Sequence, residues 1–579
     1  MRIASAPTDA ATLLAAVPAD ERVALVDAGF VGHQHALRLG LTDPRFSASA
    51  LPGAVSVLPS ARAAFGHALE QAASGAAGDT VVRVDALADR VATALEADGT
   101  ELYRPDLGAL VATVPVDPQA RNEARQAVAA VDEEAIRLRT AVKSRDGFFT
   151  TYFISPYSRY IARWCARRGL TPNQVTTASL LTALIAAGCA ATGERWGFVA
   201  AGVLLLFSFV LDCTDGQLAR YSLQYSTMGA WLDATFDRAK EYAYYAGLAL
   251  GAANASGDDV WALALGAMIL QTCRHVVDFS FNEANHDATA NTSPTAALSD
   301  KLDSVGWTVW VRRMIVLPIG ERWALIAVLT AVTTPRITLV VLLIGCAFAA
   351  LYTTAGRVLR SLTRRAERTD RAARALADLA DNGALASYIS KIRRNGGGRT
   401  MPYAPVILAL IGAGALIANV TTGGTSSVIV GAVFYVVLSG LALSLPLTGP
   451  LDWLVPPVFR AAEYGTVLVL AAHADVNGAL PAAFGLVAAV AYHHYDTVYR
   501  IRGGTGAPPH WLVRAIAGQE GRTLLVAVAA ALLSAQDFVV ALTVMAVLVA
   551  LVVLTESIRF WVIAARQGAP AVHDEGEPA

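Results

Sequence analysis

The sequence is poor in charged residues. Of 579 residues, 16% are charged and 55% are hydrophobic, whereas soluble domains carry about a quarter charged residues. This balance excludes a soluble protein over the whole length. The formal net charge is −1, so no positive excess argues for nucleic acid as a partner. We therefore expect an integral membrane protein with a soluble part.

Cysteine is also scarce. The five cysteines lie on or beside apolar segments without metal-ligand spacing, so we expect no disulfide framework. Cys213 lies among acids, which disfavour a thiolate, and is interpreted as a packing residue. The N-terminus lacks the basic and then apolar pattern of a signal peptide. The first 140 residues contain no Gly-rich phosphate loop and no catalytic constellation.

The most informative stretch runs from Leu211 to Tyr242 and carries four carboxylates where apolar runs end and begin. Asp212 and Asp215 are spaced i, i+3, and Asp233 and Asp237 are spaced i, i+4, so each pair shares a helix face. If the two helices pack antiparallel, the four acids converge on one pocket. They would repel one another, and one or two divalent cations would hold them ionised. Oxygen ligands suit Mg²⁺ or Mn²⁺.

Small residues and one arginine lie between and beside these acids. Gly216, Ala219 and Gly229 would let helix backbones approach closely or let a phosphorylated ligand lie against the helix. Arg220 offers a forked donor for phosphate.

Residues 1–140 predict a small soluble α/β domain. Strands are expected at 21–30, 79–85 and 107–117, and helices at 61–73, 85–99 and 120–143. A basic, aromatic segment at 148–171 follows and predicts an amphipathic helix in the membrane interface. Its arginines could contact lipid headgroups or a phosphorylated acceptor, or serve only as positive-inside anchors.

Two sets of apolar spans occupy the rest of the chain, each span near the roughly 20 residues that a bilayer needs. We expect spans at about 174–192, 196–212, 230–250, 258–276, 318–334 and 336–356, and again at about 404–421, 426–446, 460–474, 479–497, 523–535 and 537–557. The expected domains are 1–140, 141–360, a charged linker at 361–402, a second bundle at 403–566, and a disordered tail at 567–579. The distribution of Arg and Lys between loops predicts that the four aspartates face the cytoplasm.

The order of spans suggests an internal duplication. Residues 236–242 align with 458–464, residues 274–278 with 492–496, and Arg322 with Arg522. Phe459 stands where the first half has Asp237, so the second bundle is expected to be a degenerate copy without a metal site. The alternative is that the two sets of spans are similar only because both are apolar, and that the aligned residues match by chance.

The acids and small residues together read D-x-x-D-G-x-x-A-R-x8-G-x-x-x-D-x-x-x-D, which resembles the signature of the CDP-alcohol phosphotransferase (CDP-alcohol phosphatidyltransferase) family. Pro172–Asn173 before the first span fits the same family. The resemblance covers about residues 140–360. The long helix before residue 147 also resembles the join in fused enzymes with a preceding sugar-nucleotidyltransferase domain. The nucleotide-binding glycines of that domain are absent here, so this domain is expected to be inactive.

The resemblance implies transfer of a substituted phosphate from a CDP-linked donor to an alcohol, with release of CMP. Asp212, Asp215 and Asp233 would bind metal, and Asp237 would complete a two-metal site and act as the general base. The cytidine nucleotide would be held by a further set: Gly216, Ala219, Arg220, Gly229 and Asn173. Lys143 and Asp146 are further candidates to line the same nucleotide site. The family also dimerises through the membrane, so either a homodimer or a pseudo-dimer within one chain is implied.

Two other functions remain open. Aspartate-rich membrane prenyltransferases also bind Mg-pyrophosphate through similar acid pairs, although they do not require the G-x-x-A-R insert. The second bundle could instead act as a non-enzymatic scaffold. The acceptor stays open among inositol phosphate, glycerol phosphate and other polyols. His275, His493 and His494 could be ligands or proton carriers, or structural residues at the interface.

Overall fold

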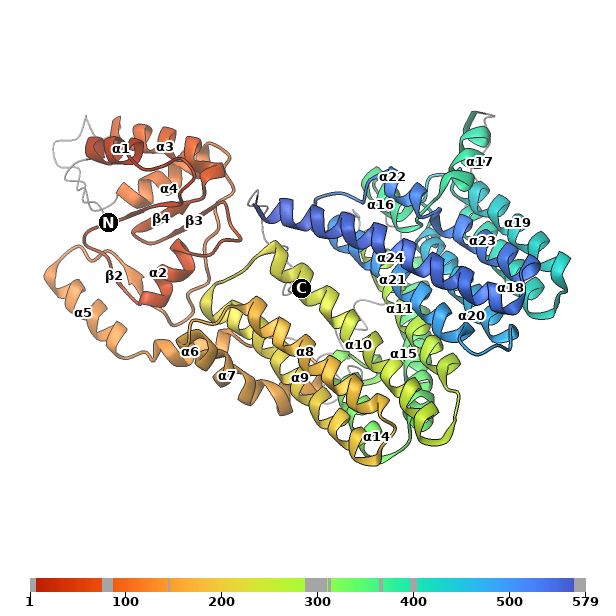
Figure 1. Cartoon of the computed structure of the whole chain (residues 1–579). Coiled ribbons are helices and arrows are strands. Elements are labelled where there is room, and N and C mark those ends of the chain that lie inside the picture. The colour runs from red at the N-terminus through yellow and green to blue at the C-terminus, as the bar shows by residue number, and fades with distance from the viewer. Residues whose placement is uncertain are drawn as a thin grey trace.

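The structure is a computed structural model of the chain (Figure 1), described over residues 7–74, 87–143, 146–286, 310, 314–363, 368–395 and 403–566. Two expectations lie outside the described residues: the strand at 79–85 and the disordered tail.

The N-terminal domain is a small α/β unit, as expected. Strands β1 (Val23–Val26), β4 (Ala54–Val57) and β3 (Ala48–Leu51) form an antiparallel sheet in that order. Helices α2 (Gln34–Leu41) and α4 (Leu87–Ala97) both pack on it and lie on opposite sides in Figure 1. The remaining elements are α1 (Pro7–Ala15), η1 (Pro59–Ala61), α3 (Arg62–Ser74), β2 (Val31–Gly32), β5 (Ala112–Thr113), α5 (Pro118–Ala129) and α6 (Glu133–Thr140).

Sequence reasoning missed the hairpin of β3 and β4. Its strands consist largely of Ala, Ser and Val, and their pairing across a turn at Gly53, with φ of +78°, depends on burial rather than on a strong strand pattern. Conversely, the strand expected at 107–117 is confined to β5. Pro115 has no N–H to donate, so it cannot extend the β2–β5 pairing as a donor.

The first helical bundle follows the N-terminal domain. Its elements are η4 (Thr150–Ile154, a π-helical turn), α7 (Ser155–Arg167), α8 (Pro172–Ala191), α9 (Arg195–Ser222), α10 (Thr227–Ser256), α11 (Trp261–Asn285), α14 (Ile319–Val332) and α15 (Pro335–Thr363). Helix α8 begins with a capping box in which Thr171 and Gln174 satisfy each other's backbone N–H groups, and Pro172 stands at the first helical position. Helix α8 packs against both α9 and α10.

The contact between α8 and α10 depends on glycine. A methyl group added at Gly251 would lie 2.0 Å from the carbonyl oxygen of Ala190, so only glycine lets the two backbones approach this closely. This contact sets where α10 lies relative to the helices beside it.

Gly251→Ala is therefore expected to lower the free energy of unfolding by about 1–3 kcal/mol, because the helices must separate. Gly188→Ala on α8 is the matched control, since nothing lies within 4 Å of a methyl group there. Melting temperatures in detergent would report both changes. An unchanged melting temperature for Gly251→Ala would show that α8 and α10 do not pack this tightly.

The second bundle repeats the packing of the first. Its elements are α16 (Asp370–Leu379), α17 (Ala384–Asn395), α18 (Ala404–Thr422), α19 (Thr425–Ala442), η5 (Asp452–Leu454), α20 (Val455–His473), α21 (Ala479–Arg502), α22 (His510–Ala515), α23 (Gly518–Leu532) and α24 (Ala535–Arg566). In the first bundle α8 packs on α9 and α10, α9 on α7 and α14, and α11 on α10 and α15. In the second, α18 packs on α19 and α20, α19 on α17 and α23, and α21 on α20 and α24.

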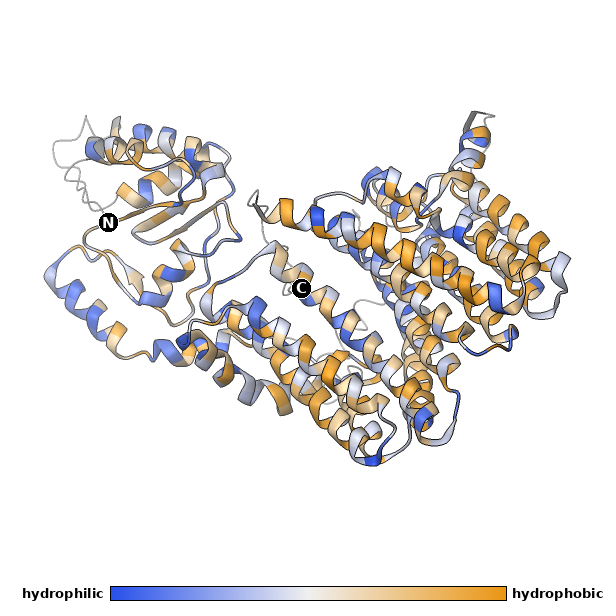
Figure 2. Cartoon of the chain, in the orientation of Figure 1, coloured by the Kyte–Doolittle hydropathy of each residue, from blue (hydrophilic) through white to orange (hydrophobic). Residues whose placement is uncertain are grey.

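Among the described residues, eight helices are long and apolar enough to cross a membrane: α8, α9, α15, α18, α19, α20 with η5, α23 with α22, and α24. The other four expected spans coincide with α10, α11, α14 and α21. Helix α10 carries many charged residues and α14 has 14 residues. Figure 2 shows hydrophobic residues along the helices of both bundles and more hydrophilic ones along α5 and α6. The expectation of a mainly α, polytopic membrane protein is thus confirmed.

The two bundles pack against each other. Helix α11 contacts α20 and α21, and α10 contacts α21 and α24. His275 Nδ1 lies 2.6 Å from the Tyr495 hydroxyl, and the rings of Trp231 and Trp561 stack at 6.1 Å. One hydrophobic core therefore runs through both bundles.

Candidate functional site: an acidic centre between two helices

The acidic centre lies where α9 ends and α10 begins. Helix α9 closes with Leu223 in the left-handed conformation, with φ of +55°. Ser226 then caps α10 by accepting a hydrogen bond from the Gly229 N–H at 2.9 Å. This short connection returns the chain beside the end of α9, so the acids of both helices face each other.

Three of the four predicted acids converge. Asp212, Asp215 and Asp233 each offer one carboxylate oxygen, and these atoms lie within 4.8 Å of one another. Asp215 is buried, and its Oδ2 has no hydrogen-bond partner among the described residues. A buried carboxylate oxygen without a donor is costly, and hard divalent cations prefer such oxygen ligands. The three residues therefore fit a divalent metal ion.

Asp237 lies beside this group and forms a hydrogen bond with a lysine, Lys240. Its Oδ1 accepts a hydrogen bond from Lys240 Nζ at 3.1 Å, and the same ammonium group pairs with Asp212. The Lys240 side chain is fully buried, 5.7 Å from the ring centroid of Trp323. Lys240 thus offsets part of the repulsion between the two carboxylates.

Sequence reasoning missed Lys240. The signal was available, because Lys240 is three residues after Asp237 and seven after Asp233, on the same face of α10. A lysine within an apolar helix is expensive to bury unless it is paired. The tertiary structure supplies one partner, Asp212, from another helix.

A second buried charge group lies one turn further along α10. Glu241 pairs with Arg238 at 2.7 Å and with Arg322, on α14, at 3.0 Å, and it accepts a hydrogen bond from the Tyr245 hydroxyl at 2.6 Å. These contacts tie the helix carrying Asp233 to α14.

The predicted nucleotide residues divide into two groups. Asn173 and Gly229 lie together, since a methyl group added at Gly229 would be 2.9 Å from Asn173 Oδ1. Arg220 points elsewhere: its Nε donates to the carbonyl oxygen of Ala141 at 2.5 Å. At Gly216 an added methyl group would meet only the Arg220 guanidinium, at 3.5 Å.

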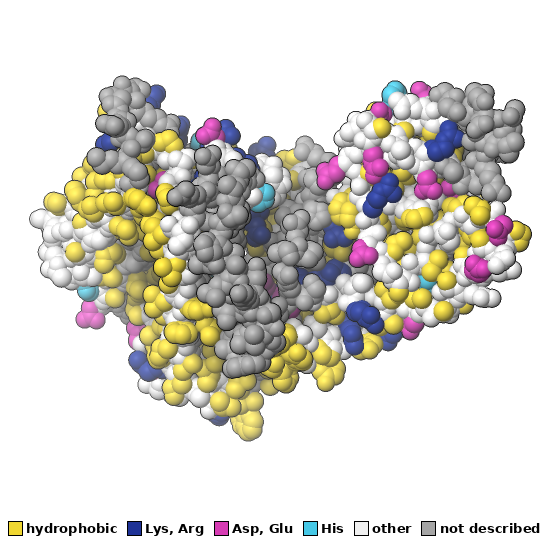
Figure 3. Space-filling model, turned by 180° about the vertical axis from the view of Figure 1, so that it is seen from behind, with side chains coloured by type: hydrophobic (Ala, Val, Ile, Leu, Met, Phe, Trp, Pro, Cys, Tyr) yellow, Lys and Arg dark blue, Asp and Glu magenta, His cyan; other side chains and the backbone are white. Residues whose placement is uncertain are grey.

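The N-terminal domain and α6 hold the end of α9. Arg38 donates to the carbonyl oxygen of Ser222 at 3.3 Å, and Arg137 donates to that of Tyr221 at 3.2 Å. The Tyr221 hydroxyl donates to Glu134 at 2.9 Å. The N-terminal domain therefore contacts the end of α9, just before the segment that joins the two acid-bearing helices. Figure 3 shows Lys and Arg side chains near this junction.

Two segments of the chain match families of known proteins. Residues 169–351 match the family model described as CDP-alcohol phosphatidyltransferase. Residues 370–579 match a family of unknown function, DUF5941, which begins within the expected linker. The chain is thus a polytopic helical membrane protein with an acidic centre. Its residues 169–351 are similar to the CDP-alcohol phosphatidyltransferase family.

Curated relatives resemble part of the chain. A phosphatidylinositol phosphate synthase of Mycolicibacterium smegmatis is 36% identical over 124 residues, which are 21% of this chain and 53% of the relative. An archaetidylinositol phosphate synthase of Pyrococcus horikoshii is 35% identical over 91 residues, 16% of this chain and 47% of the relative. A bifunctional IPC transferase and DIPP synthase of Aquifex aeolicus is 32% identical over 114 residues, 20% of this chain and 26% of the relative. The chain thus spans about a quarter to a half of these relatives' lengths.

Proposed function

We propose that the chain transfers a substituted phosphate group from a CDP-linked donor, such as CDP-diacylglycerol, to the hydroxyl of an alcohol or polyol, and releases CMP. The observation that carries this proposal is the convergence of Asp212, Asp215 and Asp233 within the segment that matches the family. The direct test is incubation with labelled CDP-diacylglycerol and detection of CMP. A labelled prenyl diphosphate serves as the alternative donor, and turnover of that donor alone would favour a prenyltransferase.

In the proposed reaction, the acceptor hydroxyl oxygen forms a bond to the phosphorus that carries the substituent, and the bond from that phosphorus to the CMP oxygen breaks. Asp237 accepts the hydroxyl proton as general base. Lys240 keeps the Asp237 carboxylate oriented through its hydrogen bond. Asp212, Asp215 and Asp233, with Asp237 completing the set, would hold Mg²⁺ or Mn²⁺, which would supply positive charge to neutralise the donor pyrophosphate and the leaving CMP.

The nucleotide is proposed to lie beside the helix ends that meet at this centre. Asn173 and Gly229 are adjacent, and the absence of a side chain at Gly229 and Gly216 leaves room for a ligand against the backbone. Ala219 follows on α9, whereas the Arg220 side chain turns toward Ala141.

We propose a phosphorylated polyol as the acceptor. Two of the relatives are named as synthases of inositol phosphate lipids. In this chain, Arg274 on α11 is 7% exposed, and its Nε and Nη1 atoms are buried without a hydrogen-bond partner among the described residues. Its neighbour Asp278 pairs with Arg357. A phosphate group would satisfy the open side of the Arg274 guanidinium. Mass identification of the lipid lost on deletion of the gene tests this acceptor.

Metal removal gives a further prediction. Chelation with EDTA should abolish CMP release, and added Mg²⁺ or Mn²⁺ should restore it, because bare carboxylates would repel the donor pyrophosphate. Ca²⁺, which takes longer ligand distances, is the comparison ion. Full activity after exhaustive chelation would contradict the assignment of Asp212, Asp215 and Asp233 as metal ligands.

We also propose that the acidic centre faces the cytoplasm. The soluble N-terminal domain contacts the end of α9 that carries the acids, so both lie on one side of the membrane. Arg357 and Arg360, at the end of α15, add positive charge to a loop expected on that side. A soluble phosphorylated acceptor would reach the site there.

For the second bundle we propose a non-catalytic copy of the first. It contains the same buried charge group: Arg460 pairs with Glu463 at 2.8 Å on α20, and Arg522 on α23 pairs with Glu463 at 2.6 Å. These residues are the ones that the sequence aligns with Arg238, Glu241 and Arg322. The packing order of the helices is also the same.

The second bundle lacks the acid pairs of the first bundle, and other side chains occupy the corresponding positions. Phe459 occupies the position of Asp237 and is fully buried. Asp381, from the turn between α16 and α17, reaches Arg460 at 3.0 Å, Arg522 at 2.7 Å and His493 at 3.0 Å. An experimental structure should superpose α8–α11, α14 and α15 on α18–α21, α23 and α24. Bundles that fail to superpose would rule out the copy.

A further inference from the structure

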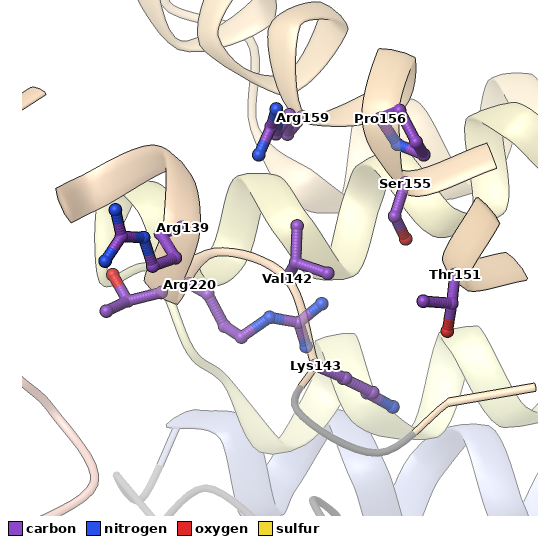
Figure 4. Close-up of a pocket in the computed structure, with 9 residues that line it drawn as sticks. Arg139, Val142, Lys143, Thr151, Ser155, Pro156, Arg159 and Arg220 are labelled. Atoms are coloured by element: carbon purple, nitrogen blue, oxygen red, sulfur yellow. The ribbon is translucent and has the colours of Figure 1, made fainter. Parts of the chain in front are cut away.

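A cavity of about 640 Å³ lies beside the acidic centre, between the end of α6, the start of α7 and the end of α9. Figure 4 shows its lining. Arg159, Pro156 and Ser155 come from α7 and Arg220 from α9, while Val142 and Lys143 follow α6. The Arg220 guanidinium lies 3.5 Å from a methyl group added at Gly216, the residue that follows Asp215, so the cavity adjoins the acidic centre.

Among the described residues that line the cavity, none is a carboxylate, and the cations are Arg139, Lys143, Arg159 and Arg220. None of Arg139, Lys143 and Arg159 forms an ion pair with an acid among the described residues, and like charges around one cavity repel each other. The surrounding arginines differ in this respect, since Arg163 and Arg137 both lie within 4.0 Å of Glu134.

Two of these cations are held in place. Arg159 lies over the ring of Tyr160 at 5.1 Å, and its Nε is buried without a hydrogen-bond partner among the described residues. Arg220 donates its Nε to Ala141, which fixes the guanidinium toward the cavity, as Figure 4 shows. Guanidinium groups fixed in this way are suited to the oxygens of phosphate.

Hydroxyl groups complete the lining. Ser155 Oγ accepts a hydrogen bond from Gln217 at 3.4 Å, so its own proton can be donated to another acceptor. Thr151 lies beside it in the lining. The other face of α7 exposes Tyr157 and Trp164, which are typical of a membrane interface. If α7 lies in the interface, as the sequence predicts, the cavity would be at the level of lipid headgroups.

We propose that this cavity binds a phosphate ester. The phosphate lies between Arg159, Arg220 and Lys143, with Ser155 donating a further hydrogen bond, and the rest of the ester occupies the space beside Val142 and Pro156. Two sources share this chemistry: a soluble polyol phosphate and the headgroup of an anionic lipid. Only the soluble source rests on the proposed function: the cavity would then bind the same class of ester as the acceptor, at a site separate from the one proposed at Arg274.

Binding is tested on the full chain without any CDP-linked donor, so the result does not depend on catalysis. In the first arm, the protein in phosphatidylcholine nanodiscs is titrated calorimetrically with inositol 1-phosphate. In the second arm, phosphatidylglycerol is added to the nanodiscs and the lipid retained by the protein is counted by native mass spectrometry. Arg159→Gln removes one charged partner, and Arg163→Gln, on the same helix but paired with Glu134 outside the cavity, is the matched control.

The Arg159→Gln variant should bind one of the two probes about ten-fold more weakly, as expected for loss of one charge-assisted hydrogen bond. Arg163→Gln should stay within about two-fold of the parent chain. Weaker inositol 1-phosphate binding identifies a soluble ester, and reduced lipid retention identifies a headgroup. If Lys143→Gln and Arg159→Gln both leave the two probes unaffected while melting temperatures are unchanged, the proposal is wrong. A chain that binds a probe but releases no CMP would refute the proposed function alone.

Discussion

Asp237→Asn should lower CMP release by about 10²- to 10⁴-fold, the usual contribution of a general base, and leave the protein folded. The amide has the shape of the carboxylate but cannot accept the proton of the acceptor hydroxyl. Lys240 keeps its second partner, Asp212, so the buried ammonium group is not left unpaired. The measurement is CMP release from CDP-diacylglycerol at saturating acceptor.

Measurements of Mn²⁺ binding distinguish a general base at Asp237 from a structural or metal-binding residue there. Mn²⁺ binding, followed by electron paramagnetic resonance, should persist in Asp237→Asn, because Asp212, Asp215 and Asp233 converge without it. It should be lost in Asp215→Asn. Asp258→Asn is the control, since this half-buried acid pairs with Arg336 away from the site. If Asp237→Asn retained more than about a tenth of the activity, the proton would have to go to another group.

Asp381→Asn should destabilise the chain by about 3 kcal/mol without touching the acidic centre of the first bundle. Asp381 is 3% exposed and contacts Arg460, Arg522 and His493. Without the Asp381 carboxylate, the guanidinium groups of Arg460 and Arg522 keep their ion pairs with Glu463 but lose those with Asp381. Breaking a buried ion pair typically costs about 3–5 kcal/mol. The melting temperature in detergent should fall clearly, whereas that of Asp258→Asn should not change.

The pH dependence of stability gives an independent check on Asp381. Burial alone would raise the pKa of its carboxyl, but Arg522, Arg460 and His493 outweigh it and hold that pKa well below the usual range. The carboxyl pKa is thus lower in the folded than in the unfolded chain, where it is about 3.9. Its contribution is complete above that value and is lost as pH falls toward the folded pKa. The melting-temperature difference between parent and Asp381→Asn should therefore be constant near neutral pH and shrink in acid. A difference that grew in acid would contradict this role.

The helical spans and the acid pairs could be predicted from local sequence. Apolar runs of near 20 residues and acids spaced three and four apart specify helices and shared faces, and the structure brings three of the four acids together. The roles of Asn173, Gly216, Ala219, Arg220 and Gly229 in nucleotide binding remain predictions, as do the domain boundaries. Arg220 shows the limit of a local reading, because its side chain bonds to Ala141 rather than facing the same way as Gly229.

The sequence alone predicted a membrane protein with converging acid pairs, because hydropathy and residue spacing are local properties of the chain. That the second bundle is a copy of the first stays a prediction. The tertiary structure decided which charges meet. Lys240 lies between Asp212 and Asp237. In the second bundle, Asp381 pairs with Arg522. The cations around the cavity at α6, α7 and α9 come from segments up to 81 residues apart, Arg139 to Arg220. Such pairings depend on packing between helices, because a buried charge is costly unless a partner from a distant part of the sequence lies beside it.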